Sequence, residues 1–235
     1  MADPVTCTIE QGIATITLDD GKANALSPGL IAAVHVALDR AQAESATVVL
    51  GGRPGRFSGG FDLTILTGGG EGAVKLLRAG FELSHRLLSY PRGVVVACTG
   101  HAIAMGAFLL LSGDHRIGIS GGGHRIHANE VALGMTMPHA AIEVCRLRLS
   151  PSALQQAVVL AAPYDHDRAV AAGFLDEVVA EADLRSTAHS VAQRLHGLPA
   201  GAFAATKLRL RASALAALKD AIDRDGADLR SLMGG

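Results

Sequence analysis

The chain has 235 residues, of which 49% are hydrophobic and 18% are charged, and its formal net charge is −1. This length allows one large domain, or one domain with an appendage, and a sizeable core. The chain has 21 basic and 22 acidic side chains, so it lacks the net positive charge that attracts phosphate backbones. We therefore expect no nucleic-acid partner.

The first residues show neither the basic nor the apolar segment of a signal peptide. The longest apolar runs are interrupted by glycine and are shorter than a membrane span. The three cysteines have no paired spacing, so neither a disulfide framework nor a zinc site is predicted. We therefore expect a soluble, cytoplasmic protein.

Short strands and helices alternate in the first half of the chain. The β-branched stretches 5–10 and 13–18 surround Gln11-Gly12 and predict a hairpin. Ser27-Pro28 is a helix start signal, and apolar residues follow it at helical spacing. The next elements are expected as a buried strand at 47–50, a short helix at 62–66, a helix at 71–90, a strand at 94–98, a helix at 105–112 and a strand at 116–119.

Beyond Glu130 the pattern is helical almost to the end of the chain. Helices are expected at about 138–149, 151–161, 165–172, 181–196 and 200–230. Alternation followed by a helical tail predicts an α/β fold with an α-helical C-terminal appendage. We place the boundary at residue 180, which gives a core at 1–180 and a helical region at 181–235.

Three generic motifs fail on their context. Residues 118–122 match the G-x-S-x-G pattern, but glycines rather than a helix follow Ser120. Residues 68–73 imitate a dinucleotide-binding fingerprint, without a clear strand before them or an acidic residue at the required distance. His124 and His127 lack a third ligand at a suitable spacing. We therefore predict no serine nucleophile, no nucleotide-binding turn and no metal.

Three other segments form a more specific pattern. Residues 57–63 (Phe-Ser-Gly-Gly-Phe-Asp-Leu) and 100–107 (Gly-His-Ala-Ile-Ala-Met-Gly-Ala) each follow a buried strand and open a helix, and 129–135 begins with Asn-Glu. In the first two, small residues allow a sharp turn that leaves free backbone N–H groups at a helix start. Two such groups can converge on one oxygen and stabilise its negative charge. Taken singly, each segment is also explained as an ordinary helix start.

Together and in this order, the segments resemble the crotonase superfamily, the enoyl-CoA hydratases and isomerases, over nearly the whole chain. Residues 22–26 (Lys-Ala-Asn-Ala-Leu) resemble its first CoA-contacting loop, and 164–179 resemble the stretch before its C-terminal helices. The resemblance implies a spiral of ββα turns, C-terminal helices that build a homotrimer or a hexamer, and an acyl-CoA substrate without a permanently bound cofactor. It places CoA contacts at Lys22, Ala23, Ala25, Ser58, Gly60, Phe61, Asp62 and Leu63.

The resemblance also places the oxyanion donors on the backbone N–H groups of Phe61 and Met105, and a catalytic carboxyl on Glu130. Hydratases of the family carry another glutamate three residues beyond the second donor, where this chain has Phe108. One carboxyl suffices to move a proton between carbons, whereas water addition needs a second proton relay. We therefore expect an enoyl-CoA isomerase of fatty-acid metabolism, with a hydratase or an inactive acyl-CoA-binding protein as alternatives.

The aromatic ring of Phe108 is expected to raise the pKa of Glu130, which suits a carboxyl that acts in turn as base and acid. Phe61 and Met105 are expected to shape the acyl pocket with their side chains.

Other polar residues are weaker candidates for a role in the reaction. Glu143 is expected on an exposed or interface face, and His101 and His139 in loops near the site. Asp62 is expected to complement the dipole at a helix start. Lys207 is expected either to reach a CoA phosphate or to be an ordinary solvated lysine.

Overall fold

The computed structural model describes residues 3–233 and begins with the predicted hairpin. Strands β1 (Val5–Glu10) and β2 (Ile13–Leu18) pair antiparallel, with Val5 opposite Leu18. Gln11 and Gly12 form the turn with φ of 50° and 75°, the left-handed conformations that tight hairpin turns require.

The hairpin forms one edge of a six-stranded sheet with the order β1-β2-β3-β5-β7-β10. From β2 onward, all neighbouring strands of this sheet are parallel. The added strands are β3 (Thr47–Gly52), β5 (Val94–Ala97), β7 (His115–Ile119) and β10 (Glu177–Val179). The expected strands at 47–50, 94–98 and 116–119 are thus confirmed, while β10 lies between the expected helices 165–172 and 181–196, where no strand was predicted.

A second sheet of four strands, in the order β4-β6-β8-β9, was missed by the sequence analysis. Its strands are β4 (Gly55–Ser58), β6 (Gly100–Ile103), β8 (Arg125–His127) and β9 (Tyr164–Asp165). They are too short to show an alternating pattern, and glycine or histidine occupies several of their positions. Successive turns of the chain give one strand to each sheet and then a helix, so the expected α/β spiral of ββα turns is confirmed.

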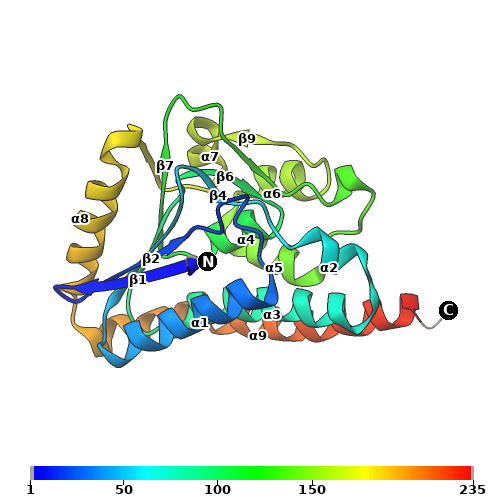
Figure 1. Cartoon of the computed structure of the whole chain (residues 1–235), viewed down its shortest axis with the longest axis horizontal. Helices are drawn as coiled ribbons and strands as arrows, with labels where there is room; N and C mark the ends of the chain where they lie inside the picture. Colours follow the sequence, from blue (N-terminus) through cyan, green and yellow to red (C-terminus); the bar gives the residue numbers. More distant parts are fainter. Residues whose placement is uncertain (1–2, 234–235) are drawn as a thin grey trace.

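Helices surround the sheets on both sides (Figure 1). In α1 the Ser27 hydroxyl accepts a hydrogen bond from the Leu30 N–H at 3.2 Å, which is the predicted cap. The longer helices are α1 (Pro28–Ala43), α3 (Gly70–Ser89), α5 (His139–Arg148), α8 (Leu184–His196) and α9 (Ala200–Met233). The shorter ones are α2 (Leu63–Thr67), α4 (Met105–Leu111), α6 (Pro151–Val158), α7 (His166–Ala172) and the 3₁₀ turns η1 (Val131–Leu133) and η2 (Glu181–Asp183).

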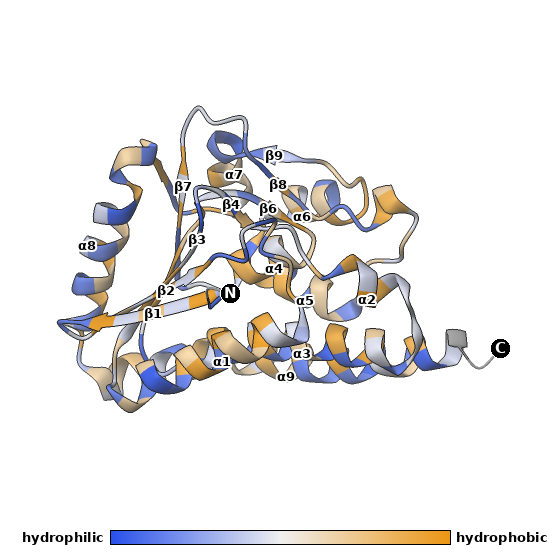
Figure 2. Cartoon of the chain, viewed as in Figure 1, coloured by the Kyte–Doolittle hydropathy of each residue, from blue (hydrophilic) through white to orange (hydrophobic). Residues whose placement is uncertain are grey.

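Alternation along the central strands divides the core into two layers. Val48 and Leu50 of β3 face the large cluster formed with α1, α3, α4, α5 and α9, whereas Val49 faces a smaller cluster that α8 covers. Successive side chains of a strand point to opposite faces, so a strand buried on both faces is apolar throughout. Helix α8 carries both apolar and hydrophilic residues (Figure 2), as expected for a helix with one buried face.

The C-terminal helix α9 packs along α3 and against α5 of its own chain. Arg78 of α3 pairs with Asp223 at 2.5 Å, and Glu71 pairs with Arg230 at 3.1 Å, so the two helices run antiparallel. Residues 181–233 therefore pack against the rest of the chain, and a domain boundary at residue 180 stays a prediction. Within residues 3–233, no helix combines the length and apolar character needed to cross a bilayer.

Candidate active site

The turn from β4 into α2 is held by buried hydrogen bonds. The Ser58 hydroxyl donates to the Asn24 carbonyl at 2.8 Å and accepts from the Gly60 N–H at 3.2 Å. Ser58 is fully buried, so its side chain fixes the turn and has no exposed surface for a ligand. Asp62 caps α2 by accepting from the Thr64 N–H at 3.0 Å, the predicted helix-start role.

The turn from β6 into α4 lies directly against this first turn. Gly60 has a φ of 95°, and a Cβ built on it would lie 2.9 Å from the Ile103 carbonyl oxygen and 3.4 Å from the Met105 nitrogen. Only glycine therefore fits at residue 60, and the two glycine-rich segments are in contact. Ala104 adopts a left-handed φ of 49° immediately before α4 begins at Met105.

The structure brings the two predicted oxyanion residues together. A Cβ built on Gly80 of α3 would collide with the Phe61 ring and lie 3.6 Å from Met105 Cε. Among the described residues, no acceptor receives a hydrogen bond from the N–H of Phe61 or of Met105. Neither amide therefore has an acceptor in the described chain, and their role as oxyanion donors stays a prediction.

Glu130 follows β8, whose His127 is paired with Ile103 of β6. Its side chain is buried with 7% exposure, and within the described chain Oε2 has no hydrogen-bond partner. Burial raises the pKa of Glu130 to about 7, although its own backbone N–H opposes the shift. A carboxyl with this pKa can accept and return a proton near neutrality.

A cavity of about 670 Å³ connects these groups. Phe61, Ala104, Phe108, Asn129 and Glu130 line one part of it. Asn129 Oδ1 is also buried, and among the described side chains and backbone it has no hydrogen-bond partner. Since buried polar groups are normally paired, two unpaired oxygens on neighbouring residues are typical of a functional site.

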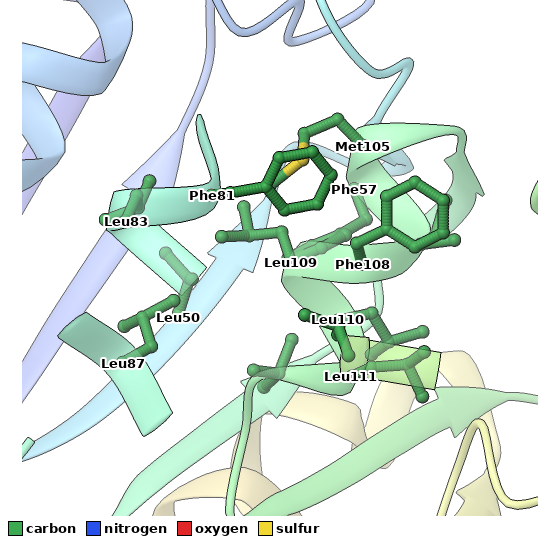
Figure 3. Packing of buried hydrophobic residues seen from close by; sticks show 14 of the residues in the cluster. Leu50, Phe57, Phe81, Leu83, Leu87, Met105, Phe108, Leu109, Leu110 and Leu111 are labelled. Atoms are coloured by element: carbon green, nitrogen blue, oxygen red, sulfur yellow. The ribbon is translucent and has the colours of Figure 1, made fainter. Parts of the chain in front are cut away.

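Aromatic rings form the wall beside Glu130. Phe81 stacks on Phe108 with ring centroids 5.9 Å apart, and Phe61 meets Phe81 edge-on at 6.3 Å. Figure 3 shows Phe81 of α3 and Phe108 of α4 among the buried side chains, with Met105 close to Phe81. Met105 is fully buried and is not one of the residues that line the cavity. The expectation that its side chain shapes the acyl pocket is therefore wrong, whereas Phe61 does line the cavity.

The predicted CoA-contacting loop lies beside the first turn. Ala23 accepts a hydrogen bond from the Gly59 N–H at 2.8 Å, and Leu26 forms a parallel bridge with Phe61. Lys22 is exposed, and Ala25 is partly exposed. The loop, the turn and the cavity are thus contiguous, while contacts of Lys22, Ala23, Ala25 or the 60–63 segment with CoA stay predictions.

The sequence analysis missed two residues that hold this loop. Asn24 is fully buried, and its side-chain amide reaches the carbonyls of Leu18, Arg56 and Phe57 at 2.9–3.1 Å. Asp20 accepts hydrogen bonds from three backbone N–H groups, and these lower its pKa although partial burial acts in the opposite direction. The Asp-Gly-Lys-Ala-Asn sequence, rich in turn residues, was the available signal.

Helix α9 closes another part of the cavity. Asp225, Asp228 and Leu229 line it, and Asp225 accepts hydrogen bonds from the N–H groups of His139 and Ala140 at 2.7 and 2.9 Å. Asp225 therefore caps the start of α5, where Pro138 precedes the helix and offers no side-chain cap.

Both expectations for Lys207 are wrong. Its Nζ lies 2.6 Å from Asp114 Oδ2, and only 5% of its side chain is exposed, so it is neither solvated nor free to reach a phosphate. Burial lowers the pKa of Lys207 to about 8 in spite of this ion pair. Arg211 pairs with the other oxygen of Asp114 at 2.8 Å. Lys207 thus fastens α9 to the core.

The remaining candidates divide between the cavity and the surface. Glu143 pairs with Arg146 at 3.5 Å and does not line the cavity. His101 lies in β6, and His139, the first residue of α5, lines the cavity and approaches Asp228 at 3.3 Å. Neither histidine occupies a loop, contrary to expectation.

The motifs at 118–122 and 68–73 each include part of a connection between two elements. Ser120 follows β7 and leads into the glycine turn at 121–123 rather than a helix, and Gly68 and Gly69 join α2 to α3. In the described part of the chain, no three His, Cys, Asp or Glu side chains gather closely enough to hold a metal ion.

Comparison with known proteins decides the family. The sequence model of the enoyl-CoA hydratase/isomerase family matches residues 8–232. The chain belongs to this family. The resemblance to the crotonase superfamily is therefore confirmed over almost the whole length.

Solved structures of family members have the same fold. An enoyl-CoA isomerase of Mycobacterium tuberculosis is 50% identical, with a TM-score of 0.93 and coverage of 97% of this chain and 99% of that one. A second structure of the same M. tuberculosis protein is described as a probable enoyl-CoA hydratase. The human mitochondrial Δ3-Δ2-enoyl-CoA isomerase is 27% identical, with a TM-score of 0.91 and coverage of 97% and 91%.

A curated relative, a probable enoyl-CoA hydratase of Mycobacterium avium, is 29% identical over 201 residues, 84% of this chain and 77% of the relative. Similar proteins thus carry the names of both reactions, and the reaction of this chain is inferred from its own site.

Proposed function

We propose that this protein is an enoyl-CoA isomerase that moves a carbon–carbon double bond from the 3,4 to the 2,3 position of an acyl-CoA. The Glu130 carboxylate removes a proton from C2 of the thioester, and the electron pair moves onto the thioester oxygen. The same carboxyl then returns the proton to C4, so that the double bond ends between C2 and C3. Proton and electrons balance without any other reactant.

The observation that carries the proposal is the pairing of one buried carboxyl with an apolar partner position. Glu130 and Phe108 line the same cavity, and burial has raised the pKa of Glu130 to about 7. Phe108 can neither accept nor donate a proton, so Glu130 performs both transfers. A carboxyl with a pKa near neutrality loses and regains a proton at comparable cost, which suits this double role.

The enolate oxygen would be held by the backbone N–H groups of Phe61 and Met105. The lack of an acceptor for either amide in the described chain and the contact between their two turns support this assignment. Loss of one such donor costs about 2.7–4 kcal/mol of transition-state stabilisation in other enzymes, so the pair would supply a large part of the rate enhancement.

We also propose that CoA lies along the 22–26 loop and the 60–63 segment, as in the family resemblance, with no resident cofactor. A homotrimer or a hexamer in the cytoplasm remains our expectation. Exposed apolar side chains on α9 support association, since Leu208 and Leu210 are exposed at 45% and 80%. Equilibrium sedimentation would show a mass of three or six chains if this is right, and one chain if it is wrong.

Hydration of a 2-enoyl-CoA is the second candidate, because relatives of this chain are named hydratases. Two assays on one preparation separate the candidates. Incubation with a 3-enoyl-CoA should increase the absorbance of the conjugated thioester, whereas incubation with crotonyl-CoA should leave that absorbance unchanged. Loss of absorbance with crotonyl-CoA at a comparable rate would favour hydration, and no change with either substrate would favour an inactive acyl-CoA-binding protein.

A further inference from the structure

Phe61, whose backbone N–H is one of the two proposed oxyanion donors, is paired with the 22–26 loop. Leu26 forms a parallel bridge with Phe61. The Leu26 N–H donates to the Gly60 carbonyl at 2.8 Å, and the Leu26 carbonyl accepts from the Asp62 N–H at 3.2 Å. Both peptide groups that flank Phe61 are therefore hydrogen-bonded to the backbone of a single residue.

This pairing sets the direction of the Phe61 N–H. The peptide bond between Gly60 and Phe61 is trans, so the carbonyl of Gly60 and the N–H of Phe61 point to opposite sides of the chain. Because the carbonyl points at Leu26, the N–H points away from the loop, and it has no acceptor in the described chain. Any rotation of this peptide group would turn the donor and weaken the bond to Leu26. The proposed oxyanion donor is therefore aimed by a hydrogen bond on its opposite side.

Asn24 joins the loop to the end of β4. Its side-chain amide donates to three carbonyls at 2.9–3.1 Å, those of Leu18, Arg56 and Phe57. Its Oδ1 accepts from the Asp20 N–H at 3.0 Å. Asn24 is fully buried, and a buried carbonyl that loses its donor is costly to leave unpaired. An amide both donates and accepts, so Asn24 fixes the loop against β4.

The backbone of Asn24 makes a second link to the turn. Its carbonyl accepts from the Ser58 hydroxyl at 2.8 Å, and the same hydroxyl accepts from the Gly60 N–H at 3.2 Å. Asn24 has a φ of 52°, a left-handed conformation in which asparagine is enriched. One path thus runs from Asn24 through Ser58 to Gly60, and another runs along the chain to Leu26. Both paths end on the peptide group that carries the donor.

We propose that Asn24 is a positioning residue, which aims the Phe61 N–H at the thioester oxygen without touching the substrate. Asn24 is not one of the residues that line the cavity, so it acts through the backbone of the turn. This role rests on the proposed function, because it assumes an enolate oxygen held by that N–H. It adds that a buried side chain outside the cavity controls the turnover number.

Replacement of Asn24 by glycine tests the proposal in kinetics. Glycine removes the amide but adopts the left-handed conformation without strain, so Asn24→Gly isolates the hydrogen bonds. We expect kcat for a 3-enoyl-CoA to fall at least about tenfold, while the Kd of a saturated acyl-CoA stays within about twofold of the wild-type value. Tyr90→Phe is the matched control, because it removes another buried bond from a side chain to a carbonyl, that of Tyr90 to Ala46 at 3.1 Å. It should keep the wild-type kcat.

The absorbance of a bound conjugated thioester separates positioning from a general loss of structure. Cinnamoyl-CoA has no hydrogen on C4, so it cannot undergo the double-bond shift, and hydrogen bonds to its carbonyl oxygen move its absorbance to longer wavelength. The wild-type protein and Tyr90→Phe should show this red shift, and Asn24→Gly should lose most of it. If Asn24→Gly does not fold, Ser58→Ala cuts one of the two paths and should also reduce the red shift and kcat.

The possible results are distinguishable. A wild-type kcat or a wild-type red shift in the folded Asn24→Gly variant, or in the Ser58→Ala variant that replaces it, would overturn the proposal. The absence of a red shift in the wild-type protein would overturn it as well. A protein without turnover whose red shift is lost in Asn24→Gly would refute the isomerase assignment and leave the positioning role standing.

Discussion

Phe81 of α3 stacks on Phe108 of α4 with ring centroids 5.9 Å apart and ring planes inclined by 29°. Both rings are almost completely buried, so Phe108 is fixed by packing against a neighbouring helix. The family resemblance places a glutamate of hydratases at the position of Phe108. The stacked pair therefore makes this side of the site apolar, and for this reason the proposed mechanism assigns both proton transfers to Glu130.

The pH dependence of turnover should follow the ionisation of Glu130. Burial raises the pKa of Glu130 to about 7, and only the carboxylate can remove the first proton. We therefore expect kcat/KM for a 3-enoyl-CoA to rise about tenfold per pH unit below pH 7 and to level off above it. Initial rates between pH 5 and 8.5 measure this profile. A profile that is already flat at pH 5.5 would contradict the assigned base.

The same carboxyl should make the protein less stable at high pH. Between its ordinary pKa of 4.5 and the folded-state pKa of about 7, the folded chain binds more protons than the unfolded chain, so stability falls as pH rises through this window. Glu130→Gln removes the charge, and we expect it to stabilise the fold at pH 8 by about 2–3 kcal/mol. The gain should vanish below pH 4.5. Urea titrations at fixed protein concentration measure it, and a destabilised variant at pH 8 would refute the prediction.

Gly60 should be indispensable for turnover because its lack of a side chain allows the two turns to lie in contact. A Cβ at this position would lie 2.9 Å from the Ile103 carbonyl oxygen, in a backbone conformation that favours glycine. We expect Gly60→Ala to push the Phe61 and Met105 amides apart and to lower kcat about 10²-fold, the effect of losing one oxyanion donor. Gly201→Ala, where an added Cβ meets nothing within 4 Å, is the control. Equal kcat values for the two variants would refute this role.

Asp114 should contribute more to stability than either of its cationic partners. It pairs with Lys207 at 2.6 Å and with Arg211 at 2.8 Å, and all three side chains are largely buried. Asp114→Asn leaves two buried cations unpaired and should cost about 3–5 kcal/mol of unfolding free energy. Lys207→Met leaves the Asp114–Arg211 pair in place and should cost less than about 2 kcal/mol. Chemical denaturation of both variants checks the order, and the reverse order would contradict the account of this cluster.

Sequence patterns predicted the first-half helices and the first-half strands of the six-stranded sheet well, because local physics determines them. Ser27 and Pro28 mark a helix start, and the run from Val48 to Leu50 is apolar because β3 is buried on both faces. The second sheet escaped prediction since its strands are short and are stabilised by pairing with distant segments. β8, for instance, exposes Arg125 and shows no apolar alternation.

The site was predictable where backbone conformation requires particular residues. Gly60 and Glu130 were identified, because the close approach of two turns needs glycine and the family resemblance includes the glutamate. The burial of Lys207 depends on Asp114, which lies 93 residues away in the sequence, and no local pattern reveals that contact. The role of α9 in closing the cavity was missed for the same reason.

Proton exchange at the substrate is the most direct test of Glu130 as the single acid–base group. A 3-enoyl-CoA is incubated in heavy water with the wild-type protein and with Glu130→Gln, and deuterium at C2 and C4 is followed by NMR. The account predicts deuterium at these carbons with the wild-type protein, and at least a 10²-fold slower exchange with the variant, whose fold circular dichroism confirms. Equal exchange rates in the two proteins would contradict it.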